Sequence, residues 1–204
     1  MQLKLINLIR VMIVGFIMDG NRRFARQHNQ PIIQGHARGA STGSNILEWW
    51  IKYLPTSANS TEPPNLPKYL TCWAFSSENF SRTSEEKEGL FRLMEAEFKS
   101  LVYTSLVHLF RIRVCVIGGE QEIKQLPIEL QTTIELLESS TREYDNLFLL
   151  LAVGYGGRRE IVESVQKVLK AGKTLDEESI NSETYCARLG VPSVDMIVRT
   201  SEKR

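Results

Sequence analysis

Short apolar segments alternate with amphipathic helical patterns along this chain, and this alternation constrains its fold more than any other feature. The segments are rich in Val, Ile and aromatic residues. They lie at about residues 11–18, 69–75, 112–118, 147–153 and 194–199. Strands that are apolar on both faces are typical of parallel sheets covered by helices on both sides. The sequence therefore predicts an α/β fold with a mostly parallel central sheet surrounded by helices.

The helical patterns between these segments have recognisable starts and stops. Thr83 with Glu86 three residues later predicts a capping box before residues 84–110, and Pro127 can open the next helix. Gly172 is suited to end the helix that follows the fourth apolar segment. The apolar faces of these three helices are predicted to carry Leu90, Met94, Phe98, Leu101, Val102, Leu106 and Leu109; Leu130, Ile134 and Leu137; and Ile161, Val165, Val168 and Leu169.

The bulk properties of the chain indicate one domain over residues 1–204. A chain of 204 residues can bury a full core, and 42% hydrophobic with 24% charged residues argues against disorder. Residues 55–67 contain four prolines and no periodicity, which predicts a surface loop. The net charge of +1 provides no general basic field, so we expect no nucleic-acid partner. Any anion must be met by local arginines.

The cysteines and the apolar run at the start of the chain indicate the cellular compartment of the protein. Cys72, Cys115 and Cys186 lack metal-ligand spacing, and we expect buried thiols in a reducing compartment. Lys4 and Arg10 interrupt the apolar run at the start of the chain, which makes it too broken to span a membrane. We therefore expect a cytoplasmic protein, and peripheral contact with a membrane such as the endoplasmic reticulum stays open.

Polar motifs follow each apolar segment. "MDGNRR" follows the first, "FSSENFSR" the second, "GGEQE" the third, "GYGGRRE" the fourth and "RTSEKR" the fifth. In an open α/β sheet, ligands bind at the carboxyl ends of the strands, where helix N-termini present free N–H groups. Scattered loop polarity is the alternative. Five motifs at one predicted edge favour a binding site.

The first motif combines a carboxylate with two guanidinium groups. Asp19 at a strand end can hold Mg²⁺, which commonly binds one or two carboxylates plus substrate phosphates. Asn21, Arg22 and Arg23 suit phosphate oxygens, since guanidinium groups bind such oxygens in a bidentate manner. A plain salt bridge is the alternative for an isolated Asp-Arg pair. The glycine and the second arginine favour the phosphate site.

Two further motifs add candidates. His36 precedes Gly39 and Ala40 in "GHARGA", small residues that permit close approach, and it can contact phosphate, handle a proton or serve structure alone. Ser76 and Asn79 in "FSSENFSR" can be binding residues or only turn and cap residues. Arg82 in the same motif adds a second anion contact.

Six strings together resemble the cis-prenyltransferase family, which includes undecaprenyl diphosphate and dehydrodolichyl diphosphate synthases. They are "MDGNRRFA", "GHARGA", "WAFSSENFSR", "IRVCVIGG", "GYGGRREI" and "DMIVRTSEKR", and they occur in the family's order over nearly the whole chain. The resemblance implies a homodimer or a heteromer that uses Mg²⁺. Its reaction would condense isopentenyl diphosphate with an allylic, farnesyl-type diphosphate to give a polyprenyl diphosphate.

The resemblance also implies residue roles. Asp19 would coordinate Mg²⁺ and act catalytically with His36 and Asn79, the last assisting proton removal. Arg199 would grip isopentenyl diphosphate, and a helix face would line an apolar tunnel, although an ordinary core is the default for such a stripe. The allylic diphosphate would be held by Gly20, Asn21, Arg22, Arg23 and His36; the reacting centre would be lined by Phe75, Ser76, Asn79 and Arg82; and the tunnel by Leu90, Met94, Phe98 and Leu101.

The sequence departs from the family pattern in three ways, one at Ile32 and two at the final motif. Ile32 stands where the family usually has an arginine, four residues before His36. The final "RTSEKR" lacks the usual glycine and ends at Arg204, before a serine and an acidic block that complete the second site. Three hypotheses follow: a chain-elongating prenyltransferase, a terpene-synthase-like lyase that ionises and cyclises an allylic diphosphate, and a subunit of a heteromeric prenyltransferase.

Overall fold

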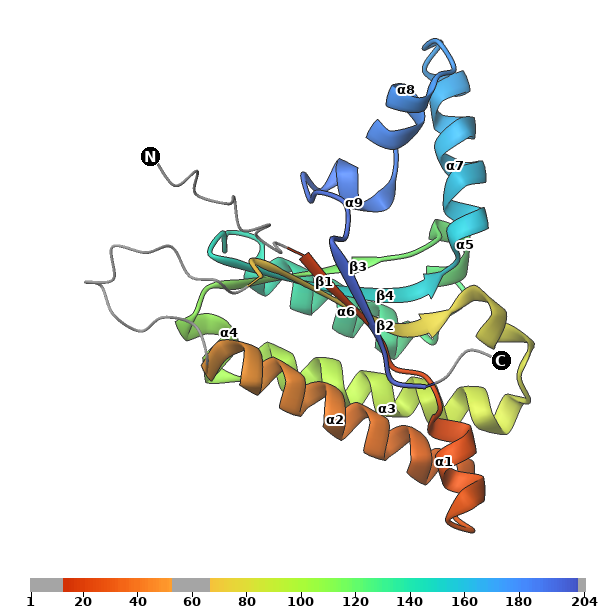
Figure 1. The fold of residues 1–204 in the computed structure, drawn as a ribbon, viewed down its shortest axis with the longest axis vertical. Helices are drawn as coiled ribbons and strands as arrows, with labels where there is room; N and C mark the ends of the chain where they lie inside the picture. Colours follow the sequence, from red (N-terminus) through yellow and green to blue (C-terminus); the bar gives the residue numbers. More distant parts are fainter. Residues whose placement is uncertain (1–12, 53–66, 202–204) are drawn as a thin grey trace, which may run out of the picture.

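The fold is built on a parallel sheet, as the sequence predicts. The structure is a computed structural model that describes residues 13–52 and 67–201. Within these ranges the sheet has the order β3-β4-β2-β1-β5, and every neighbouring pair is parallel (Figure 1). The strands are β1 (Ile13–Ile17), β2 (Tyr69–Ser76), β3 (Ile112–Ile117), β4 (Leu147–Tyr155) and β5 (Met196–Arg199).

Helices cover the two faces of this sheet. Strand β4 shows why both faces need covering: Leu149 and Leu151 pack into the core beside α2, α3 and α6, whereas Leu150 packs on the opposite face near α9. Figure 1 shows α2 and α3 side by side along one face and α7 to α9 beyond the other. The described helices are α1 (Asn21–Gln27), α2 (Ile32–Lys52), η1 (Ser77–Ser81, a 3₁₀ turn), α3 (Ser84–Tyr103), α4 (Ser105–Leu109), α5 (Glu120–Ile123), α6 (Ile128–Thr141), α7 (Gly157–Lys170), α8 (Glu177–Ser182) and α9 (Tyr185–Arg188).

The helix predicted over residues 84–110 is broken. Thr104 has an extended backbone, with φ −70° and ψ 115°, and its hydroxyl donates to the Ser100 carbonyl at 2.6 Å. Threonine side chains that bond to nearby backbone groups favour helix ends over helix interiors. The short α4 is therefore a separate helix, and Leu109, predicted on the apolar face, is 73% exposed.

Helix α7 is the second place where the predicted face differs. Val168 is buried as expected, but Ile161 and Leu169 are exposed, because α7 extends away from the sheet and packs against α8 (Figure 1). Gly172 follows the end of α7 in a left-handed conformation with φ 65°, as predicted.

Other expectations are met or lie beyond the described ranges. Pro127 precedes α6, whose Leu130, Ile134 and Leu137 are buried as predicted. The expected surface loop at 55–67 lies, except for Pro67, outside the described residues. Among the helices that the structure describes, none is both long and apolar enough to cross a membrane.

Candidate functional site

The strand order decides which polar motifs meet. All strands are parallel, so the motifs that follow them share the carboxyl edge of the sheet, as predicted. Strands β2, β1 and β5 are consecutive neighbours, whereas β3 and β4 form the other half of the sheet. The motifs after β1, β2 and β5 therefore lie close together, and those after β3 and β4 lie on the other half of the edge, next to the motif after β2.

A tight turn after β1 presents Asp19. The Asp19 N–H donates to the Ile17 carbonyl at 2.9 Å, and Gly20 then adopts φ 97°, a left-handed conformation that favours glycine. The Gly20 N–H donates to Asp19 Oδ1 at 2.6 Å. The turn thus fixes the carboxylate beside the first residue of α1, Asn21.

Arg199 at the end of β5 pairs with Asp19. Arg199 Nε donates to Asp19 Oδ2 at 3.1 Å, and a second, shorter contact comes from Nη2. The Thr200 hydroxyl donates to the Asp19 carbonyl oxygen at 2.8 Å. The hydrogen bond from Arg199 lowers the pKa of Asp19, so the group is a carboxylate at neutral pH. Its side chain remains 35% exposed and can accept a further partner.

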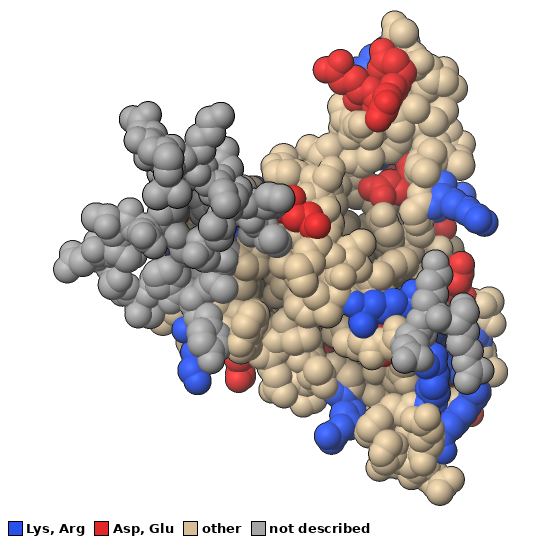
Figure 2. All heavy atoms as spheres, in the orientation of Figure 1, with Lys and Arg blue, Asp and Glu red and all other residues tan. Residues whose placement is uncertain are grey.

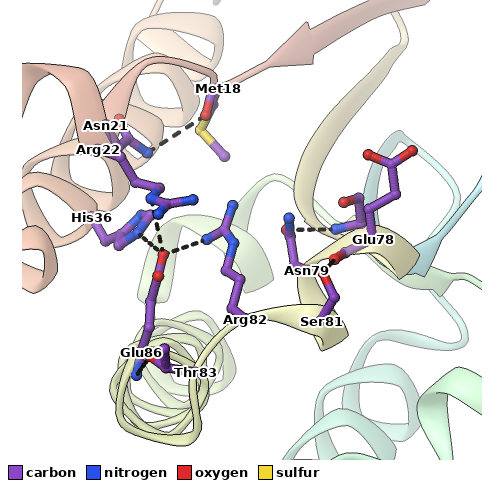
Figure 3. Close-up of polar contacts among 11 residues, drawn as sticks. Met18, Asn21, Arg22, His36, Glu78, Asn79, Ser81, Arg82, Thr83 and Glu86 are labelled. Atoms are coloured by element: carbon purple, nitrogen blue, oxygen red, sulfur yellow. Dashed lines mark hydrogen bonds and ion pairs between the residues drawn. The ribbon is translucent and has the colours of Figure 1, made fainter.

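Glu86 on α3 joins three basic side chains from different elements (Figure 3). Its Oε1 lies 3.0 Å from Arg82 Nη1, 3.3 Å from His36 Nε2 and 3.5 Å from Arg22 Nε. The predicted capping box is only half formed: Thr83 Oγ1 accepts the Glu86 N–H at 3.3 Å, but the carboxylate turns toward the cations instead. Sequence reasoning missed this role, although Arg82 four residues before Glu86 was an available signal.

His36 lies at the buried end of this cluster. It is 7% exposed, and burial lowers its pKa, while the contact with Glu86 acts in the opposite direction. The small residues of its motif allow α2 to approach α1 closely. A Cβ atom at Gly39 would lie 2.5 Å from the Asn21 side-chain nitrogen, and one at Gly35 would lie 2.3 Å from the Asn21 carbonyl oxygen.

The motif after β2 is partly structural. Asn79 Oδ1 accepts the Ser76 N–H at 3.0 Å, which is the cap alternative raised for these residues. Phe75 is 1% exposed, and its ring lies 5.0 Å from that of Phe80 and 5.4 Å from that of Phe91. The structure places Phe75 in the core behind the turn, where it supports the turn that carries Arg82.

These elements form a polar pocket of about 490 Å³, and basic side chains gather over this part of the surface (Figure 2). Of the predicted residues, Gly20 and Asn21 also line it. Arg26 is a basic residue that sequence reasoning missed, one helical turn after Arg22. The ionisable residues that line the pocket are Asp19, Arg22, Arg23, Arg26, His36 and Arg82. Cations therefore outnumber carboxylates on its walls.

An apolar cavity of about 230 Å³ lies between α2, α3 and the sheet. Met18, Asn21 and His36 line both this cavity and the polar pocket, so the two spaces adjoin. The cavity is lined by all four residues predicted for an apolar tunnel: Leu90, Met94, Phe98 and Leu101.

In the motifs after β3 and β4, charged side chains pair with one another. Arg159 Nε lies 3.0 Å from Glu163 and 3.7 Å from Glu122. The Tyr155 hydroxyl donates to Glu160 at 2.7 Å, and burial raises the pKa of Tyr155. Two glycines of "GYGGRRE" serve close packing here: a Cβ atom at Gly154 would lie 2.7 Å from Glu122 Cβ, and one at Gly156 would lie 2.4 Å from the Ser77 hydroxyl.

A basic pocket that adjoins an apolar cavity, at the carboxyl edge of a parallel sheet, defines a protein suited to an amphiphile with an anionic head and a hydrocarbon tail. A family model described as "Putative undecaprenyl diphosphate synthase" matches residues 17–204. The chain belongs to this family, as the resemblance predicted, and relatives in it are prenyl diphosphate synthases, which are prenyltransferases.

Two archaeal relatives carry the name "Tritrans,polycis-undecaprenyl-diphosphate synthase (geranylgeranyl-diphosphate specific)". The protein of Pyrococcus horikoshii is 37% identical and that of Thermococcus kodakarensis 38% identical, each over 194 residues. The matches cover 92% of this chain and 67% of each relative. The chain thus spans about two thirds of the length of these relatives.

Solved structures share the fold. Lavandulyl diphosphate synthase from Lavandula x intermedia, in complex with dimethylallyl diphosphate, has a TM-score of 0.73 at 27% identity, over 95% of this chain and 79% of that one. A probable undecaprenyl diphosphate synthase from Campylobacter jejuni has a TM-score of 0.70 at 23% identity, over 95% and 77%. At that identity the second likeness concerns the fold alone.

Proposed function

We propose that this chain catalyses Mg²⁺-dependent cis-prenyl transfer from an allylic diphosphate to isopentenyl diphosphate, giving a polyprenyl diphosphate. The observation that carries the proposal is the junction of the two spaces at Met18, Asn21 and His36. An allylic diphosphate has a charged head, which suits the polar pocket, and an apolar tail, which suits the adjoining cavity. The names of the archaeal relatives, and the dimethylallyl diphosphate in complex with the lavender synthase, support this substrate class.

The basic residues of the pocket would hold the allylic diphosphate. Arg22, Arg23 and Arg82 offer guanidinium donors, and Gly20 and Asn21 form the turn beside them. Departure of the diphosphate builds negative charge on its oxygens. Donors that are already in place stabilise that charge more in the transition state than in the bound substrate, and this difference accelerates the reaction.

Asp19 fits a magnesium ion held mostly by substrate. Within the described residues there is no cluster of three or more acidic, histidine or cysteine ligands. Mg²⁺ commonly binds through one or two carboxylates together with substrate phosphates, and Asp19 is an ionised, partly exposed carboxylate on the pocket wall. When bound there, Mg²⁺ would neutralise charge on the departing diphosphate.

The roles of Arg199, Asn79 and His36 are part of the proposal. Arg199 would take the diphosphate of isopentenyl diphosphate and would then share its guanidinium between that anion and Asp19. Asn79 would assist proton removal by orienting the diphosphate that takes up the proton: its side-chain N–H groups would donate to that anion, because its Oδ1 already accepts the Ser76 N–H. His36, whose pKa is lowered by burial, would be neutral at pH 7 and form the pocket wall next to the reacting carbon.

A direct assay tests the proposal against its alternatives. Purified protein is incubated with farnesyl or geranylgeranyl diphosphate and labelled isopentenyl diphosphate, with Mg²⁺ or with EDTA. Label in longer products that depends on Mg²⁺ is the expected result. Release of pyrophosphate and a hydrocarbon or alcohol from the allylic diphosphate alone would instead identify a lyase. Inactivity that a second polypeptide relieves would identify a subunit of a heteromer. Sedimentation of the protein alone tests for a homodimer, and co-sedimentation with lipid vesicles tests for peripheral membrane contact.

A further inference from the structure

We propose that Glu86 is a positioning residue, which holds Arg22 and Arg82 in the orientation that receives the diphosphate. The inference rests on the proposed function. It concerns a residue on α3 that forms part of the pocket's support and does not itself line the pocket.

The geometry leaves the arginines free to bind a second partner. Glu86 Oε1 contacts Arg82 through Nη1 and Arg22 through Nε, so each guanidinium uses one nitrogen for Glu86. A guanidinium carries five N–H donors in a fixed plane. The remaining donors of both arginines are available to the polar pocket, which both residues line (Figure 3).

Burial makes the Glu86 contacts strong and specific. The Glu86 side chain is 11% exposed and that of Arg82 is 20% exposed, so water screens their attraction less than at an open surface. Arg22 is 44% exposed and reaches from the buried carboxylate toward solvent. Two long side chains from different elements are thereby ordered before a ligand arrives, which reduces the entropy lost on binding.

A helix-capping role alone does not explain this arrangement. Thr83 already caps α3, and Glu85 also places an acidic group in the first turn. Glu88 on the same helix provides the contrast: it is 65% exposed, lies 3.8 Å from Arg92 and does not line the polar pocket. Glu88 is therefore the matched control for loss of one carboxylate from this end of α3.

Loss of the Glu86 charge would leave like charges facing one another. Burial lowers the pKa of His36 most, Arg82 from the turn before α3 and Arg22 from α1 lower it further, and Glu86 is the group that opposes them. Without it, the two arginines repel each other across the cluster and lose their common acceptor. We expect them to sample several orientations, so that fewer molecules present both to the leaving diphosphate.

The first test is a double-mutant cycle on turnover. Glu86→Gln is expected to lower kcat by about 30-fold, the size of one lost hydrogen bond between charged groups, with the KM for the allylic diphosphate changed by less than about threefold. In an Arg22→Ala/Arg82→Ala background the same substitution should change kcat by less than about threefold, because the groups through which it acts are gone. Glu88→Gln should leave kcat unchanged. Equal losses in both backgrounds would overturn the proposal.

The second test needs no turnover, so it stays valid if the proposed function fails. The His36 ring-proton resonance, assigned with His36→Gln, is titrated in the wild type and in Glu86→Gln. Its pKa should fall further in Glu86→Gln, because the opposing carboxylate is lost while Arg22 and Arg82 remain. An unchanged pKa would show that Glu86 does not organise the cluster in solution. If Glu86→Gln does not fold, Glu86→Asp keeps the charge but withdraws it by one methylene, and the same changes are expected in the same directions.

Discussion

The two halves of the sheet's carboxyl edge carry similar residues and use them differently. After β3 and β4, Arg159 lies between Glu122 and Glu163, and the nearby tyrosine hydroxyls donate to glutamates. After β1, β2 and β5, the pocket walls carry four arginines and His36, with Asp19 on the wall and Glu86 behind it. In the first half Arg159 is shared between two carboxylates and tyrosine hydroxyls donate to glutamates, whereas the second half retains an excess of positive charge on its walls. An excess of positive charge on a pocket wall, more than polarity itself, suits the binding of an anion.

The sharpest test of this contrast is Asp19→Ala. We expect kcat to fall by about a thousandfold or more, because each ~1.4 kcal/mol of lost transition-state stabilisation costs a factor of ten and Asp19 is the proposed metal ligand. The protein should stay folded, since the side chain is 35% exposed. Product formation and circular dichroism measure the two effects. Asp145→Asn, which alters a surface pair with Arg111, is the control; a mutant that unfolds yet keeps its specific activity would contradict the assignment.

A matched pair of arginine substitutions compares the halves directly. Arg82→Ala should weaken pyrophosphate binding by about 10- to 100-fold, since it removes a charged hydrogen-bond donor from the pocket. Arg159→Ala should leave that affinity unchanged but slightly lower the free energy of unfolding, because Glu122 and Glu163 lose their cation. Calorimetric binding and chemical denaturation measure these changes. Equal losses of affinity in the two variants would remove the distinction between the halves.

A substitution that disturbs the close packing behind the pocket should have a smaller effect on pyrophosphate binding. Gly39→Ala would place a methyl group 2.5 Å from the Asn21 side chain, so α2 or Asn21 must shift. We expect a loss of about 1–3 kcal/mol in unfolding free energy together with weaker pyrophosphate binding. Gly172→Ala, where no atom lies within 4 Å, provides a control that tests backbone strain alone. Unchanged affinity in Gly39→Ala would show that this packing does not hold the pocket.

The smallest expected effect concerns pH. Arg199 lowers the pKa of Asp19 below its ordinary value of 3.8 in the folded protein. A carboxyl group with a lowered pKa contributes stability that is present above the unfolded-state value and is lost as the pH falls through the folded-state value. Arg199→Gln should therefore lower the unfolding temperature slightly at pH 7 and have no effect in strong acid, below both pKa values. A difference that persists at the acid end would assign the stability to something other than this ion pair.

The sequence predicts the sheet better than it predicts the side-chain network. Continuous apolar segments locate all five described strands, and motifs that follow parallel strands must share an edge, so Asp19 and Arg82 are correctly brought together. Sequence reasoning assigns Glu86 only to a local cap, because a threonine lies three residues earlier. The spacing from Arg82 could have indicated that ion pair, but only the docking of α3 against α2 brings the carboxylate to His36. The exposure of Ile161 has the same origin: amphipathic spacing shows that a face needs a partner but not where α7 is directed.

The position of β5 has a consequence for how firmly the site is assembled. Within the described sheet β5 is a four-residue edge strand that pairs only with β1, whereas β2 lies between β1 and β4. Edge strands of this length open more readily than central ones, and local opening exposes their amides to exchange with solvent. The amides of Ile197 and Arg199 should therefore exchange with deuterium faster than those of β2. Each opening would carry Arg199 away from Asp19, and in the proposed reaction this would let a second diphosphate enter beside that carboxylate.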